Sequence, residues 1–164
     1  MSFDLFVYLP ELQPEFMGRV ELALAKTGLA ATCSADTEGT IEIEFSEMEA
    51  TAFVDIGPMD LDSLSGLERL TPTQLAHLKL CRSETMFVVE AMTQSDVVKA
   101  LTHAAVAMME AGAGVLHDPQ ASASEFDELG DLVEAVPGVS DGYFFDPAHA
   151  RRWADAMYKA VGSE

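Results

Sequence analysis

Cysteine, basic side chains and long apolar stretches are all scarce in this chain of 164 residues. The two cysteines, Cys33 and Cys81, stand far apart, without a CxxC pair or a neighbouring Cys/His cluster. That spacing excludes a disulfide framework and a zinc site of the usual kind. We therefore expect two buried or idle thiols, and we expect neither a metal ion nor a cofactor.

The shortage of basic residues sets the charge of the molecule. Only 9 Lys and Arg residues stand against 28 Asp and Glu residues, so the net charge is −19. Binding to nucleic acid or to anionic lipid depends on Lys and Arg clusters that neutralise phosphate, so we expect neither a nucleic-acid partner nor a membrane. The same charge would speed encounter with a basic protein partner, or it serves only to keep the chain in solution. Both interpretations stay open.

No apolar run approaches the roughly 20 residues that cross a bilayer. The first residues, MSFDLFVYLP, also lack the basic region and the small-residue cleavage site of a signal peptide, so we expect a cytoplasmic protein. Hydrophobic residues make up 49% of the chain and charged residues 23%, which is typical of a globular protein. The length fits one domain over residues 1–164 with a core of its own.

Strand signals dominate the first third of the chain. Alternation and short apolar runs predict strands at 3–9, 29–35, 40–47 and 50–56, and helical spacing predicts one helix between 12 and 27. The clearest strand is 40–47, where Ile41, Ile43 and Phe45 alternate with Glu42 and Glu44. We expect its glutamate face to meet solvent and expect 50–56 to return beside it as a hairpin.

The segment GPMDLDSLSGLERL invites comparison with a calcium-binding loop. Asp60 and Asp62 fit its first and third positions, but Leu64, Ser65 and Thr71 stand where an oxygen ligand, the glycine and the bidentate glutamate are required. The match fails, and we expect a surface loop without a metal.

The second half is organised around a long apolar helix. A capping box beginning at Thr71 opens a short helix, and the apolar run at 87–89 predicts a central strand, 84–92, that is covered on both faces. Thr93 and Asp96 then cap a helix from about 94, which we expect Gly112 to end in the left-handed conformation. A short strand follows, and the strand-helix-strand unit predicts a parallel crossover. We expect the helix to expose one polar stripe: Asp96, Lys99, His103 and Glu110.

Beyond Pro119 the sequence predicts a helix over 124–136 with a dense acidic face, an edge strand near 143–145 and a last helix that packs Trp153. The order of elements indicates an α+β (or α/β) fold: a single domain with a mixed, mostly antiparallel sheet, helices packed on it, and C-terminal helices from about 124 closing it.

Chemistry-bearing motifs are absent. The chain has no GxGxxG, GxxxxGK[ST], GxSxG or HExxH sequence. His117 and Asp118, at the end of a predicted strand, are the one place where an imidazole and a carboxylate could border a cleft, and they are the candidate catalytic residues. The partners that a serine or cysteine nucleophile would need cannot be identified.

The strand, the buried helix and the GAGVLHDP segment together resemble the C-terminal half of small uncharacterised bacterial α/β proteins, some of which are similar to immunity proteins found beside secreted toxins. The resemblance covers about residues 84–119 and carries over no site residues, because that stretch is a packing pattern. It implies a protein that binds and occludes a toxin, and a net charge of −19 suits a basic one.

Two hypotheses follow. The favoured one is a non-enzymatic acidic binding protein, an immunity or inhibitor protein against a basic partner. Its proposed binding residues are Glu42, Glu44, Glu125, Asp127, Glu128 and Asp131. The alternative is a small-molecule binding domain or enzyme with a cleft near His117 and Asp118.

Overall fold

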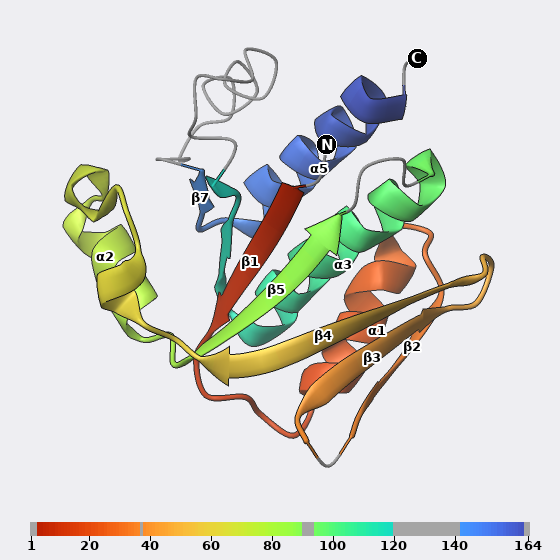
Figure 1. Cartoon of the computed structure of the whole chain (residues 1–164), viewed down its shortest axis with the longest axis horizontal. Coiled ribbons are helices and arrows are strands. Elements are labelled where there is room, and N and C mark those ends of the chain that lie inside the picture. Colours follow the sequence, from red (N-terminus) through yellow and green to blue (C-terminus); the bar gives the residue numbers. More distant parts are fainter. Residues whose placement is uncertain (1–2, 37, 90–93, 120–141, 163–164) are drawn as a thin grey trace.

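Seven strands form one sheet in the computed structural model, which describes residues 3–36, 38–89, 94–119 and 142–162 (Figure 1). The strands are β1 (Phe3–Leu9), β2 (Ala31–Ala35), β3 (Thr40–Phe45), β4 (Ala50–Pro58), β5 (Ser83–Val89), β6 (Val115–His117) and β7 (Tyr143–Phe144). The described helices are α1 (Phe16–Lys26), α2 (Pro72–Lys79), α3 (Ser95–Gly112) and α5 (Pro147–Gly162). Two 3-10 turns, Leu61–Ser63 and Leu67–Arg69, lie between β4 and α2.

The strand order is β2-β3-β4-β5-β1-β6-β7, and every neighbouring pair is antiparallel. Because β5 and β6 both run antiparallel to β1, they are parallel to each other, and α3 makes the predicted parallel crossover between them. The α+β class, the antiparallel character of the sheet and the β3–β4 hairpin are therefore confirmed.

One face of the sheet, called here the inner face, is covered by helices. In Figure 1, α1 and α3 pass behind the strands. Alternate side chains of β1 and β3 point toward them, because successive residues of a strand face opposite ways. The main core therefore joins these strand residues to buried residues of α1, α3 and α5, among them Leu5, Val7, Ile43, Leu24, Met108 and Trp153.

The opposite face, called here the outer face, is covered only in part. A second apolar cluster lies over β1, β6 and β7, and α2 contributes Leu78 to it. Leu61, Leu64 and Leu67 pack onto the same cluster, so the segment predicted as a surface loop supplies part of this cover. The predicted capping box of α2 is confirmed: Thr71 and Gln74 exchange both of its hydrogen bonds.

The end of α3 differs from the prediction. The left-handed residue is Ala113, with φ 52°, and not Gly112. Both neighbouring glycines serve close packing instead: a Cβ on Gly112 would lie 2.6 Å from Leu9 Cδ2, and one on Gly114 would lie 2.2 Å from the Tyr8 carbonyl oxygen. A side chain at Gly114 would clash with rigid backbone, so that position requires glycine for packing, while the left-handed turn falls on Ala113.

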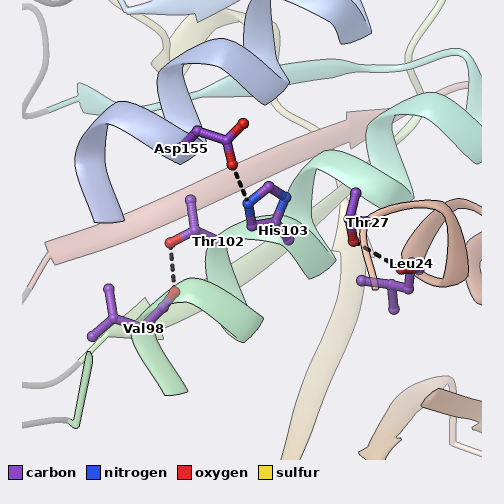
Figure 2. A network of polar contacts seen from close by, with 6 residues as sticks. All are labelled: Leu24, Thr27, Val98, Thr102, His103 and Asp155. Atoms are coloured by element: carbon purple, nitrogen blue, oxygen red, sulfur yellow. Dashed lines mark hydrogen bonds and ion pairs between the residues drawn. The ribbon is translucent and has the colours of Figure 1, made fainter. Parts of the chain in front are cut away.

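The polar stripe of α3 meets solvent only in part: Asp96 is exposed, whereas His103 and Glu110 face α5. Figure 2 shows His103 on α3 pointing toward Asp155 on α5, with His103 Nε2 3.1 Å from Asp155 Oδ1. Glu110 of the stripe accepts a hydrogen bond of 2.7 Å from Arg151 of α5. His103 is buried, so the prediction of a solvated histidine is wrong. Asp155 and Arg151 of α5 supply polar partners for His103 and Glu110 of this stripe. Thr93 lies outside the described residues, and Gln94 precedes the first turn.

Candidate functional site

None of the described helices covers the outer face over the exposed residues of β4 and β5. Phe53 of β4 is 68% exposed, and Met86 and Val88 of β5 are each 46% exposed. Phe53 alternates with the buried residues Ala52 and Val54, and Met86 and Val88 flank the buried Phe87, so all three point away from the inner core. The prediction that β5 is covered on both faces is therefore wrong at these two positions. The apolar cluster to which α2 contributes contains residues of β1, β6 and β7 and none of β5.

Carboxylates stand beside these apolar side chains. In the strand register Glu42 lies opposite Phe53, and Asp4 lies opposite Val88. Glu44 points to the same face as Glu42 and is exposed. Asp55, next along this face of β4, accepts a 2.8 Å hydrogen bond from the Thr40 hydroxyl. Glu44, Phe53, Met86 and Val88 are exposed and Glu42 is half-buried, and we call these five outer-face residues the open patch.

The other half of the outer face is closed over a stack of aromatic rings. His117 of β6 lies on Tyr143 of β7, with ring centroids 3.9 Å apart and planes 6° apart. Its Nδ1 is 2.9 Å from the hydroxyl of Tyr8 on β1. The Tyr143 hydroxyl donates to the carbonyl of Ser65 at 2.8 Å, which ties the stack to the segment between the two 3-10 turns.

Burial settles the protonation of this stack. It lowers the pKa of His117 from 6.5 to about 4, so the imidazole is neutral at pH 7. It also raises the pKa of Tyr8, with Tyr143, Glu84 and Cys81 acting in the same direction, so the phenol keeps its proton. Both groups are therefore neutral at pH 7, and one hydrogen bond joins the Tyr8 hydroxyl to Nδ1 of His117. A neutral, hydrogen-bonded histidine is a stable element of the core.

Asp118 and Cys81, near this stack, are also buried, and His77 of α2 is half-buried beside it. Asp118 is buried, and its backbone N–H donates to the carbonyl of Gly142 at 3.0 Å. Burial raises the pKa of Cys81 to about 11, so its thiol is protonated and weakly nucleophilic at pH 7. His77 donates from Nε2 to the carbonyl of Ala113 at 2.8 Å and so links α2 to the end of α3. His117 and Asp118 thus adjoin a hydrogen-bonded, buried stack.

The predicted binding residues divide into two groups. Glu42 and Glu44 lie side by side on the outer face of β3, as their alternation with Ile41 and Ile43 predicts. The other four lie outside the described residues: Glu125, Asp127, Glu128 and Asp131. The apolar members of the open patch were not among the predicted site residues. The signal for Phe53 was present, because a large apolar residue at the solvent-facing position of an alternating strand is a feature of binding surfaces.

Within the described ranges, no helix is long and apolar enough to cross a bilayer. The same ranges contain no group of three or more His, Cys, Asp or Glu side chains placed to hold a metal ion. In the segment compared with a calcium loop, Asp60 uses Oδ1 to accept from the backbone N–H of Asp62, at the start of a 3-10 turn.

Comparisons with protein-family models, with curated proteins and with solved structures found no match to this chain. The resemblance of residues 84–119 to small bacterial α/β proteins, some of them similar to immunity proteins, stays a prediction from the sequence.

Proposed function

We propose that this chain is a non-enzymatic binding protein that receives a basic protein partner on the open patch. The observation that carries the proposal is the exposure of three large apolar side chains on one sheet face beside carboxylates. Apolar patches framed by polar residues are typical of protein interaction sites. An immunity or inhibitor role in the cytoplasm is the form that the sequence resemblance suggests, and it is part of this proposal.

Apolar and charged members of the patch have separate roles in the proposal. Phe53, Met86 and Val88 supply area that gains free energy when water is removed from it, at about 25 cal/mol per Å². Glu42 and Glu44, within a net charge of −19, attract Lys and Arg side chains and speed encounter. A partner with basic side chains around an apolar centre complements both.

Capture from a lysate of the cells that make the protein tests the proposal. The tagged wild-type chain is compared with Phe53→Ser and with the double variant Glu42→Lys/Glu44→Lys. The control is Glu47→Lys/Glu49→Lys, which changes the net charge equally at exposed residues just after β3. We expect the wild type and the control to retain the same basic protein, and the two patch variants to lose it. Equal capture by all four chains would remove the patch from the proposal.

Salt separates the two contributions to binding. Exposed charge pairs are screened beyond about 10 Å at 0.1 M salt, whereas apolar contacts are not weakened by salt. We expect the Glu42→Lys/Glu44→Lys defect to shrink as salt rises and the Phe53→Ser defect to persist.

The alternative is a small-molecule site at His117 and Asp118. In its favour, Tyr8, His117 and Cys81 have shifted pKa values and lie close together, which is common at functional sites. Against it, Tyr8 is 1% and His117 6% exposed, so a dissolved substrate has little access to them. A ligand screen by thermal shift on the wild type and on His117→Asn tests it, because a site there predicts ligands that stabilise only the wild type.

A further inference from the structure

Among the described strands, β2 forms one edge of the sheet and pairs with β3 alone. An edge strand presents unpaired N–H and C=O groups to which another strand can add. Natural edges are protected by charged residues, prolines or bulges within the strand. The sequence of β2, ATCSA, contains no charged residue and no proline. Its protection must come from elsewhere.

The register identifies which backbone groups of β2 face outward. Ser46 N–H donates to Ala30 O, and Asp36 N–H donates to Thr40 O. Hydrogen-bonded pairs recur at every second residue of an antiparallel ladder, so Thr32 and Ser34 also bond to β3. The N–H and C=O groups of Ala31, Cys33 and Ala35 therefore point away from the sheet.

A carboxylate from α1 occupies the centre of this edge. The Cys33 N–H donates to Glu21 Oε1 at 2.7 Å, although the two residues belong to different elements. Cys33 is the middle residue of β2, so an incoming strand would need this N–H for the centre of its own ladder. A negatively charged acceptor at this place satisfies the donor and repels the carbonyl of an incoming strand.

We propose that β2 is a self-pairing edge that Glu21 holds closed. The strand suits pairing with a second copy of the chain, because an antiparallel arrangement centred on Cys33 places Ala31 opposite Ala35 and Thr32 opposite Ser34. All of these side chains are small and uncharged, so they neither clash nor repel. With Glu21 in place, each copy lacks the free central N–H, and the ladder cannot form.

Two variants open the edge and one matched control keeps it closed. Glu21→Ala removes the acceptor, and Glu21→Met removes it while keeping the length and helix propensity of the side chain. Glu21→Gln keeps an accepting oxygen. Mass is measured by size exclusion with light scattering over a wide range of protein concentration, in about 1 M salt, where repulsion between the acidic copies is screened to about 3 Å.

We expect Glu21→Ala and Glu21→Met to gain a species of twice the wild-type mass, with a dimer dissociation constant at least tenfold below that of Glu21→Gln. Adding Ala35→Pro, which removes an outward N–H, should restore the wild-type mass. If the folded Glu21→Met chain keeps the wild-type mass, the proposal fails. It fails equally if Ala35→Pro leaves the association intact, because the contact would then lie away from β2.

Discussion

The two halves of the outer sheet face have the same strand pattern and opposite environments. In both, large side chains of β1 and β5 alternate between the inner and the outer face. In the half where α2 contributes Leu78 to the outer cluster, Tyr8 is enclosed with His117 and Tyr143. Where α2 does not reach, Met86 and Val88 are exposed. Alternation decides which face a side chain occupies, but the cover decides whether that face is core or exposed surface.

The largest expected effect is on the covered half. Leu78 of α2 is fully buried in the outer cluster, so Leu78→Ala should lower the free energy of unfolding by about 2–5 kcal/mol. Urea denaturation measures it. Leu80→Ala is the matched control, because Leu80 is exposed beyond the end of the same helix, and it should cost less than about 0.5 kcal/mol. Equal losses would mean that α2 does not hold the covered half closed.

Gly114→Ala tests the join between the covered half and the main core. Its Cβ would lie 2.2 Å from the Tyr8 carbonyl oxygen, a rigid backbone atom, so we expect a loss of about 1–3 kcal/mol. Gly18→Ala in α1 places a Cβ where no atom lies within 4 Å, and it should instead stabilise by about 0.5–1 kcal/mol. Thermal melting of both variants measures these changes in stability. If Gly114→Ala left the stability unchanged, the close packing of Gly114 against the Tyr8 backbone would be contradicted.

The pH dependence of stability reports on His117. Its folded pKa of about 4 lies below the ordinary value of 6.5, so between these values the unfolded chain binds more protons than the folded one. Stability is therefore greatest above pH 6.5 and falls as the pH drops toward 4. From this group we expect a loss of about 1–2 kcal/mol between pH 6.5 and 5.

His117→Gln should flatten that slope, because glutamine does not titrate and its oxygen can accept from Tyr8. His103 contributes in the same direction, since burial lowers its pKa and Asp155 offsets only part of this. The double variant with His103→Gln should therefore flatten the slope further. His149→Gln removes a partly exposed histidine and serves as the control. An unchanged slope in His117→Gln would mean that the lowered pKa of His117 does not contribute to the pH dependence of stability.

The smallest effect on stability is expected on the open half. Phe53→Ser removes an exposed side chain, so the free energy of unfolding should change by less than about 0.5 kcal/mol, while capture of the basic partner is lost. A large loss of stability would show that Phe53 belongs to the core, and the contrast between the two halves would then fail.

Much of the fold was predictable because its signals are local. The alternation of Ile41, Ile43 and Phe45 with Glu42 and Glu44 placed β3 and its solvent face correctly. The Thr71 capping box placed α2, since both of its hydrogen bonds join residues three apart. Of the candidate site, the same alternation supplied Glu42 and Glu44, whereas the apolar members of the open patch were missed.

The errors occurred where a residue's surroundings come from a distant part of the chain. Val88 was expected to be covered because an apolar run resembles a buried strand, and only the position of α2 shows that this stretch is open. His103 was expected in solvent because its neighbours along α3 are polar, and only the packing of α5 brings Asp155 to it.

The sequence by itself determined the strands, most helix boundaries, the α+β class and the acidic charge, because periodicity, caps and composition act over a few residues. The tertiary structure alone decided which half of the outer face is closed, which histidines are buried, that Ala113 takes the left-handed turn, and that Glu21 lies across the β2 edge. Each of these depends on which elements meet in space. The packing of one element against another depends on many residues far apart in the chain, so no local sequence pattern predicts it.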